Sequence, residues 1–274
     1  MRGLGGRGAR LAWALAFAAF CCVAVPAFAA EQGNLDAGHP LRFEDPYPVP
    51  RGEWSVEVGG GPSHFEDQGK LLSIQKSHLR LPVEISYGAV LNAQVSVAME
   101  WFTRRYPDSL PGSKSIESGD LRVSALYNFN QETTTMPALG LKYTLELPTG
   151  TRSEGVDAEL KALLTKSISR LSFHLNVTEL LVGQRPFGSR SSRSGFDLGA
   201  SLPLGRELRH LLLAGWHSEQ DAYKGAESLH GFGVGIRRQQ SARTVLDLGV
   251  ETRNESWGKN AITIDISAGL SWSY

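Results

Sequence analysis

The stretch from residue 262 to residue 274 constrains the fold most, because its side chains alternate strictly between two chemical classes. The residues between its apolar positions are small or polar, and the apolar set is Ile262, Ile264, Ile266, Ala268, Leu270, Trp272 and Tyr274. A period of two predicts a β-strand whose two faces meet different surroundings. Two environments fit this pattern: the core of a soluble β-sandwich, or a membrane wall between lipid and a polar lumen.

The N-terminal region, residues 1–29, has the pattern of a cleaved secretory signal peptide. Arg2, Arg7 and Arg10 precede an apolar run, and Ala27-Phe28-Ala29 provides a cleavage site of small residues. Both cysteines of the chain lie in this region, so we expect neither a disulfide nor a cysteine metal site in the mature protein. Cleavage also removes three arginines and no acidic residue from a chain with 28 basic and 28 acidic residues, so the mature chain is net negative.

The mature chain divides into a short lead-in and a long repetitive region. Residues 30–51 carry prolines among charged residues, which predicts an extended, non-strand segment that we expect to be periplasmic. Residues 52–274 contain about 12 segments of strand length, and the connections between them are alternately short and long. The longer connections include residues 62–76 and 103–118, which we expect to be external loops.

An even strand number with alternating connection lengths is typical of bacterial outer-membrane barrels, whose periplasmic turns are short and whose external loops are long. A soluble sandwich has no reason to alternate in this way. We therefore predict an all-β protein, a transmembrane antiparallel up-and-down β-barrel in the outer membrane of a Gram-negative cell. Residues 157–167 fit neither the strand nor the helix period well, and we interpret them as a strand because the turn at Ser169-Arg170 leads into another alternating segment.

Aromatic residues lie near the ends of the predicted strands, which predicts two interfacial girdles. The Trp-x-aromatic end of the chain resembles the C-terminal signal of outer-membrane barrels, and this resemblance implies the barrel-assembly machinery as a partner. Lipid and lipopolysaccharide are the other expected partners. Arg185, Arg190 and Arg193 could contact lipopolysaccharide phosphates, although an ordinary solvated loop explains them equally well.

The predicted inward face carries charges of both signs, as a wet pore or a polar-packed interior requires. The lumen-lining candidates are Glu57, Arg80, Glu84, Glu100, Arg122, Lys142, Glu146, His174, Asp197, Arg237, Asp247, Glu251 and Asp265. Acidic groups outnumber basic ones in this set, which favours cations or neutral solutes. Gly231, Gly233 and Gly235 also face inward, and we interpret them as making room on the lumen wall rather than as a phosphate loop.

Catalytic patterns are absent from the sequence. Neither Gly-x-Ser-x-Gly nor His-Glu-x-x-His occurs. We interpret Ser63-His64 as part of a solvated loop, and His174 as a wall residue rather than a general base. The remaining histidines lack the spacing of metal ligands. We therefore predict no catalytic residues, no metal, no cofactor and no nucleic-acid partner.

Three stretches resemble the outer-membrane family named for the MetA pathway of phenol degradation. They are Ala37-Gly38-His39-Pro40-Leu41 through Glu44-Asp45-Pro46, the segment from Leu79 to Gly88, and Leu145-Glu146-Leu147-Pro148-Thr149-Gly150. The resemblance implies a transporter without a catalytic motif. We expect an outer-membrane channel or facilitator for passive passage of small solutes, including hydrophobic or aromatic compounds. The alternatives are an outer-membrane enzyme of the lipid hydrolase type and a structural barrel with a plugged lumen.

Overall fold

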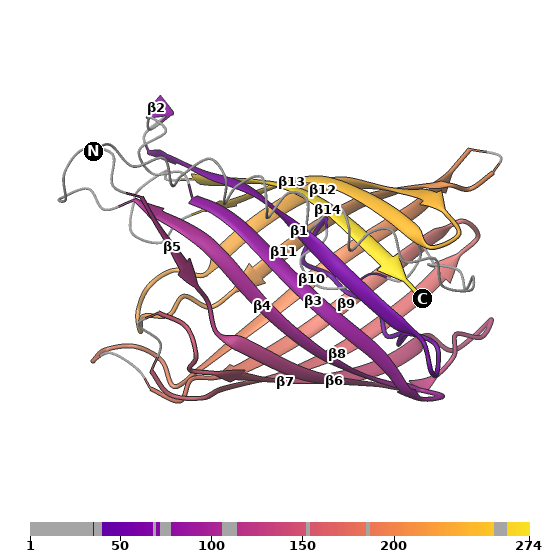
Figure 1. The fold of residues 1–274 in the computed structure, drawn as a ribbon, viewed down its shortest axis with the longest axis horizontal. Coiled ribbons are helices and arrows are strands. Elements are labelled where there is room, and N and C mark those ends of the chain that lie inside the picture. Colours follow the sequence, from indigo (N-terminus) through magenta and orange to yellow (C-terminus); the bar gives the residue numbers. More distant parts are fainter. Residues whose placement is uncertain are drawn as a thin grey trace, which may run out of the picture.

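The computed structural model describes residues 35, 40–67, 70–71, 78–105, 114–151, 154–184, 187–205, 207–254 and 262–274. The predicted signal peptide lies outside these residues. Regular structure within the described ranges consists of β-strands that surround a central lumen (Figure 1). No helix in this part of the chain is long and apolar enough to cross a membrane.

A closed antiparallel barrel of 12 strands confirms the predicted fold. The barrel strands are β1 (Trp54–Asp67), β3 (His78–Val90), β4 (Ala93–Arg105), β6 (Leu121–Asn130), β7 (Ala138–Leu147), β8 (Asp157–Ile168), β9 (Leu171–Leu181), β10 (Ser192–Leu204), β11 (His210–Glu219), β12 (Leu229–Ser241), β13 (Thr244–Asn254) and β14 (Ile262–Ser273). Each pairs with its neighbours along the chain, and β14 pairs with β1 from Ser55↔Ser273 to Glu66↔Ile262. Because every barrel strand then has two partners, the sheet has no open edge.

The predicted external loops at residues 62–76 and 103–118 are partly β-strand. β1 continues to Asp67 because its backbone pairs with β14 beyond the sequence Gly59-Gly60-Gly61-Pro62, in which side-chain alternation is lost. Glycine is required there, since a Cβ on Gly60 would lie 2.0 Å from the carbonyl oxygen of Arg80. Further along the chain, β5 (Lys114–Ser118) pairs with the end of β4, and the two-residue strand β2 (Lys70–Leu71) pairs with the end of β1. These extensions lie at the left-hand end of Figure 1, opposite the C-terminus.

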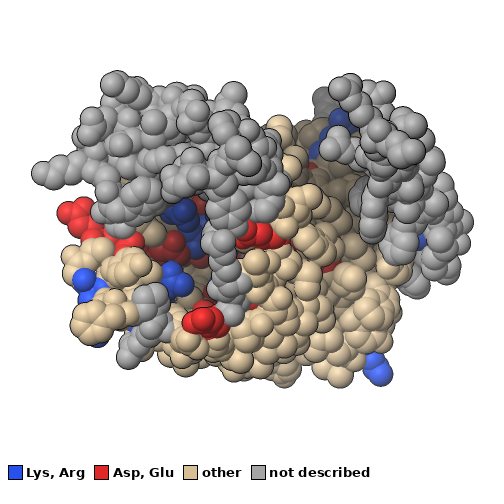
Figure 2. Space-filling view, turned by 60° about the vertical axis from the view of Figure 1, so that its left-hand side comes forward, with Lys and Arg blue, Asp and Glu red and all other residues tan. Residues whose placement is uncertain are grey.

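The outer wall of the barrel is apolar. Along β13, Leu246, Leu248 and Val250 are exposed, whereas Val245 and Asp247 on the other face are buried. Figure 2 shows the described wall mostly in tan, and most red and blue atoms gather toward the end with the long connections. A continuous exposed apolar surface of this kind matches the hydrocarbon layer of a membrane.

Aromatic rings pair at both ends of the wall, as the girdle prediction expects. Trp54 packs against Tyr87 at 4.6 Å between ring centroids, and Trp272 against Tyr274 at 5.1 Å, beside the short turns. Near the long connections, Phe196 and Trp216 form an edge-to-face pair at 5.1 Å. Amphipathic rings at these levels suit the two membrane interfaces.

A small hydrophobic core lies inside the barrel. It consists of the buried residues Leu35, Leu41, Phe43, Leu211 and Leu213. β11 is therefore apolar on both faces from Leu211 to Leu213, because the exposed Leu212 faces outward and the two buried leucines meet residues from the N-terminal part of the chain. The prolines and charges of this part predict a periplasmic position for it, but residues 40–50, the luminal segment, lie within the barrel.

Candidate functional site

Two cavities of the lumen lie on opposite sides of the luminal segment. The outer cavity measures about 420 Å³ and is lined by Pro40, Leu41, Arg42 and Glu44 of the segment together with strand residues. The inner cavity, nearer the short turns, measures about 480 Å³ and is lined by residues from Asp45 to Pro50. The luminal segment thus stands between the two mouths of the barrel.

The structure places the predicted lumen candidates around these cavities. Those that line the outer cavity are Arg80, Glu84, Glu100, Arg122, Lys142, Glu146, Glu251 and Asp265. Those that line the inner cavity are Glu57, His174 and Arg237. Asp197 lines a smaller side pocket of about 110 Å³, and Asp247 accepts a 2.7 Å hydrogen bond from Arg237.

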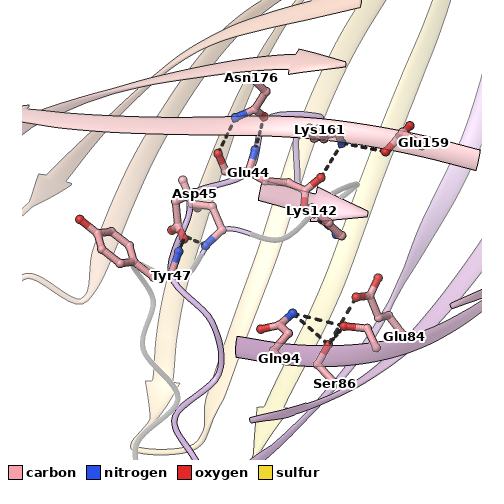
Figure 3. Close-up of polar contacts among 12 residues, drawn as sticks. Glu44, Asp45, Tyr47, Glu84, Ser86, Gln94, Lys142, Glu159, Lys161 and Asn176 are labelled. Carbon is pink, nitrogen blue, oxygen red and sulfur yellow. Dashed lines mark hydrogen bonds and ion pairs between the residues drawn. The ribbon is translucent and has the colours of Figure 1, made fainter. Parts of the chain in front are cut away.

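Glu44 is the central anchor of the luminal segment. Its two carboxylate oxygens accept hydrogen bonds from Lys142 Nζ at 2.6 Å and Lys161 Nζ at 2.5 Å (Figure 3). The side chains of Glu44, Lys142 and Lys161 are 3%, 6% and 10% exposed, so water screens this interaction weakly. A carboxylate between two ammonium groups stays ionised, and its removal would leave two like charges uncompensated.

Amide side chains of the wall hold the backbone of the luminal segment. Asn176 accepts a hydrogen bond from the Glu44 amide at 2.7 Å and donates one to the Glu44 carbonyl at 2.9 Å (Figure 3). Gln94 accepts from the Val49 amide at 2.8 Å, and Asn128 donates to the Pro46 carbonyl at 3.0 Å. These bonds satisfy backbone groups that would otherwise be buried without partners.

Inward-facing glycines provide space for the apolar side chains of the segment. Phe43 lies over Gly199 and Gly215, and a Cβ on Gly199 would come within 2.5 Å of the Phe43 ring. A Cβ on Gly233 would meet Leu41 at 2.7 Å. Gly233 and Gly235 therefore make room for the luminal segment, since a Cβ on Gly235 would meet Pro40 at 2.7 Å. Gly231 instead lies against the His217 ring of the neighbouring strand.

His174 is part of this packing. Its Nδ1 is 2.9 Å from the Thr165 hydroxyl, its Nε2 is 3.0 Å from the Ser201 hydroxyl, and its ring stacks on Phe43 at 5.1 Å. Among the described residues, both ring nitrogens have hydroxyl partners, whereas a hydrolase triad pairs one ring nitrogen with a carboxylate. The arrangement supports the luminal segment through its stacking on Phe43.

Further polar contacts lie around the segment. Arg42 Nη2 of the segment forms an ion pair with Glu219 Oε2 at 2.8 Å, and on the wall His217 Nδ1 is 3.2 Å from Glu251 Oε1. Within the described residues, no group of three or more His, Cys, Asp or Glu side chains could hold a metal ion.

Glu132 is a carboxylate outside the barrel strands, in the turn between β6 and β7. Burial raises the pKa of Glu132, but the hydrogen bond from the Ser167 amide and the Lys166 ammonium lower it, and the net shift is downward. The Glu132 carboxylate accepts hydrogen bonds from the Ser167 amide at 2.7 Å and from Lys166 Nζ at 3.0 Å. This carboxylate joins two neighbouring turns at the end of the inner cavity.

Several residues that position the segment carry no clear signal in the sequence. Lys161 was missed because the side chains of its strand fit no single period, and Glu44 because it lies outside the strands. Among the predicted residues, Arg185 and the side chain of His64 lie outside the described residues. Lys161 could have been predicted as a lumen residue if the inward face of β8 had been assigned correctly.

Solved structures of other proteins share the fold of this chain. No family model matches the chain, and no curated protein matches it. Among solved structures, the COG4313 outer membrane channel from Pseudomonas putida F1 has a TM-score of 0.61 and 14% identity, with 88% of this chain and 100% of that chain covered. The NanC porin has a TM-score of 0.56 and 10% identity, with 79% of this chain and 98% of that chain covered.

At these identities the likeness concerns the fold alone. Together with the closed strand ladder, the apolar outer wall and the paired aromatic rings, it defines the class of this protein. The chain is a β-barrel of the bacterial outer membrane.

Proposed function

We propose that the protein is an outer-membrane channel for passive passage of small solutes. The observation that carries the proposal is the position of the luminal segment between two cavities of one polar lumen. The segment is held by side-chain contacts to the wall, so it can leave without breaking a strand ladder. The description of a similarly folded protein as an outer membrane channel supports the same reading.

The solute class rests on the resemblance to the family named for the MetA pathway of phenol degradation. We propose that the chain belongs to that family and that its solutes include hydrophobic or aromatic compounds. The proposal includes no enzymatic activity. It also includes two partners: the barrel-assembly machinery, through β14, and lipopolysaccharide, near Arg190 and Arg193.

A second candidate is a structural barrel with a permanently plugged lumen. The burial of Glu44 between two lysines favours it, because separating such charges is costly. The two candidates differ in whether the luminal segment ever leaves the lumen. They therefore predict different electrical behaviour for the intact protein.

Conductance of the mature protein in planar bilayers tests the proposal. We expect discrete openings of the intact protein and larger, longer-lived openings of a variant that lacks residues 35–48. Leu248→Ala, on the lipid-facing wall, is the matched control and should conduct like the intact protein. If the deletion variant conducts while the intact protein stays closed, the plugged barrel is correct; if neither conducts, the channel proposal fails.

A further inference from the structure

Lys142 and Lys161 form an unusual pair in the barrel wall. They are direct cross-strand partners in the ladder between β7 and β8, and both side chains point into the lumen. Like charges placed directly opposite one another destabilise a sheet. The barrel alone gives no reason for this arrangement, so the pair requires an anion.

The anion present in the structure is a carboxylate. Each Glu44 oxygen is bonded to one lysine, at 2.6 Å and 2.5 Å, which is two-point recognition by separate ammonium groups. Glu159 adds a carboxylate oxygen 3.7 Å from Lys161, from the same wall. When Glu44 leaves, both lysines lose a carboxylate contact of 2.6 Å or less, which the carboxylate of a solute can replace.

The lysines are also placed where a solute can reach them. Both line the outer cavity, where Arg80, Arg122 and several acidic residues provide a hydrated approach. Lys161 lines the side pocket as well. A solute that enters from the loop end therefore meets this pair at the luminal segment.

We propose that Lys142 and Lys161 form a carboxylate-binding site of the channel, in which Glu44 is the resident ligand. A small organic carboxylate competes with Glu44 for the two ammonium groups, and its binding releases the luminal segment. The inference rests on the proposed channel function and makes it more specific. The acidic excess of the lumen favours cations or neutral solutes. At the two lysines, by contrast, we expect the channel to select monoanions.

The first test measures competition in the intact protein. Propionate and the uncharged, nearly isosteric propionamide are compared for their effect on hydrogen exchange of the Glu44 amide. We expect propionate to speed this exchange in a concentration-dependent way and propionamide to leave it unchanged. Equal effects of the two probes would overturn the proposal.

The second test measures passage into proteoliposomes at low solute concentration. In a Glu44→Gln variant, we expect propionate to enter about ten times faster than propionamide, the ratio that one charge-assisted hydrogen bond supports. Adding Lys142→Gln and Lys161→Gln should abolish this ratio. Lys166→Gln is the matched control, because Lys166 lies on the same strand but bonds to Glu132 outside the lumen, and it should keep the ratio.

The outcomes separate this inference from the channel proposal. If the variant lacking residues 35–48 conducts but does not distinguish propionate from propionamide, only the carboxylate site is refuted. If no variant conducts and propionate still speeds exchange of the Glu44 amide, the site stands and the channel fails. As a control for folding, each variant should migrate differently in electrophoresis gels before and after heating, as folded outer-membrane barrels do.

Discussion

Substitution of Gly199 by alanine should loosen the luminal segment without weakening the barrel. The added Cβ would lie 2.5 Å from the Phe43 ring, about 1 Å closer than an ordinary contact, so the ring must move. Overpacking of this kind costs about 1–3 kcal/mol. In the strand itself, alanine is slightly favoured over glycine because it restricts the unfolded chain. The cost therefore acts on docking of the segment, and the ratio of docked to released forms should fall about 5- to 150-fold.

Hydrogen exchange reads this change directly. The Glu44 amide is bonded to Asn176 at 2.7 Å, so it exchanges only when the segment opens. We expect its exchange in Gly199→Ala to accelerate by the factor above, while amides of β13 keep their protection. Ala200→Val adds bulk to the lipid-facing side of the same strand. It should change neither the exchange rate of the Glu44 amide nor the protection of the β13 amides. Unchanged exchange at Glu44, or equal loss of protection in β13, would refute the reasoning.

Three other perturbations test the wall and the turns. Leu248→Arg places a charge on the lipid face and should cost about 2–4 kcal/mol in urea unfolding from lipid vesicles; an unshifted midpoint would contradict the assigned face. Arg237→Met should cost about 3–5 kcal/mol because it leaves Asp247 buried without its 2.7 Å partner, and adding Asp247→Leu should recover most of that loss. The pKa of Glu132 is lowered in the folded protein, so this carboxylate stabilises the fold above its unfolded-state pKa, and the stabilisation is lost as pH falls through its folded-state pKa. Glu132→Gln should therefore reduce the loss of stability at acidic pH in a curve of unfolding free energy against pH.

The faces of the barrel wall could be predicted because a strand alternates its side chains over neighbouring residues. The pattern of residues 262–274 therefore determined both faces of β14 without knowledge of its partners. The end of β1 could not be found this way, because Gly59-Gly60-Gly61-Pro62 carries no alternation and the pairing with β14 decides the structure there. Backbone pairing to a distant strand leaves no local side-chain pattern.

The position of the luminal segment could not be predicted for a related reason. Its prolines and charges are typical of an exposed linker, and its partners are far along the chain: 98 residues separate Glu44 from Lys142, and 227 separate Pro40 from Ser267. An indirect signal was present in the inward-facing Leu211 and Leu213, because an apolar patch on a polar lumen needs a cover. That signal indicates a cover but does not identify the segment that provides it.

The separation between the luminal segment and its partners has a consequence for biogenesis. The segment precedes β1 in the chain, yet the side chains that hold Glu44 belong to β7, β8 and β9. Contacts across such long stretches of chain form slowly, because loop-closure entropy opposes them. The luminal segment is thus synthesised before every barrel strand, yet it is among the last parts to reach its native position. A newly inserted barrel should therefore pass through an open, leaky stage before it seals itself.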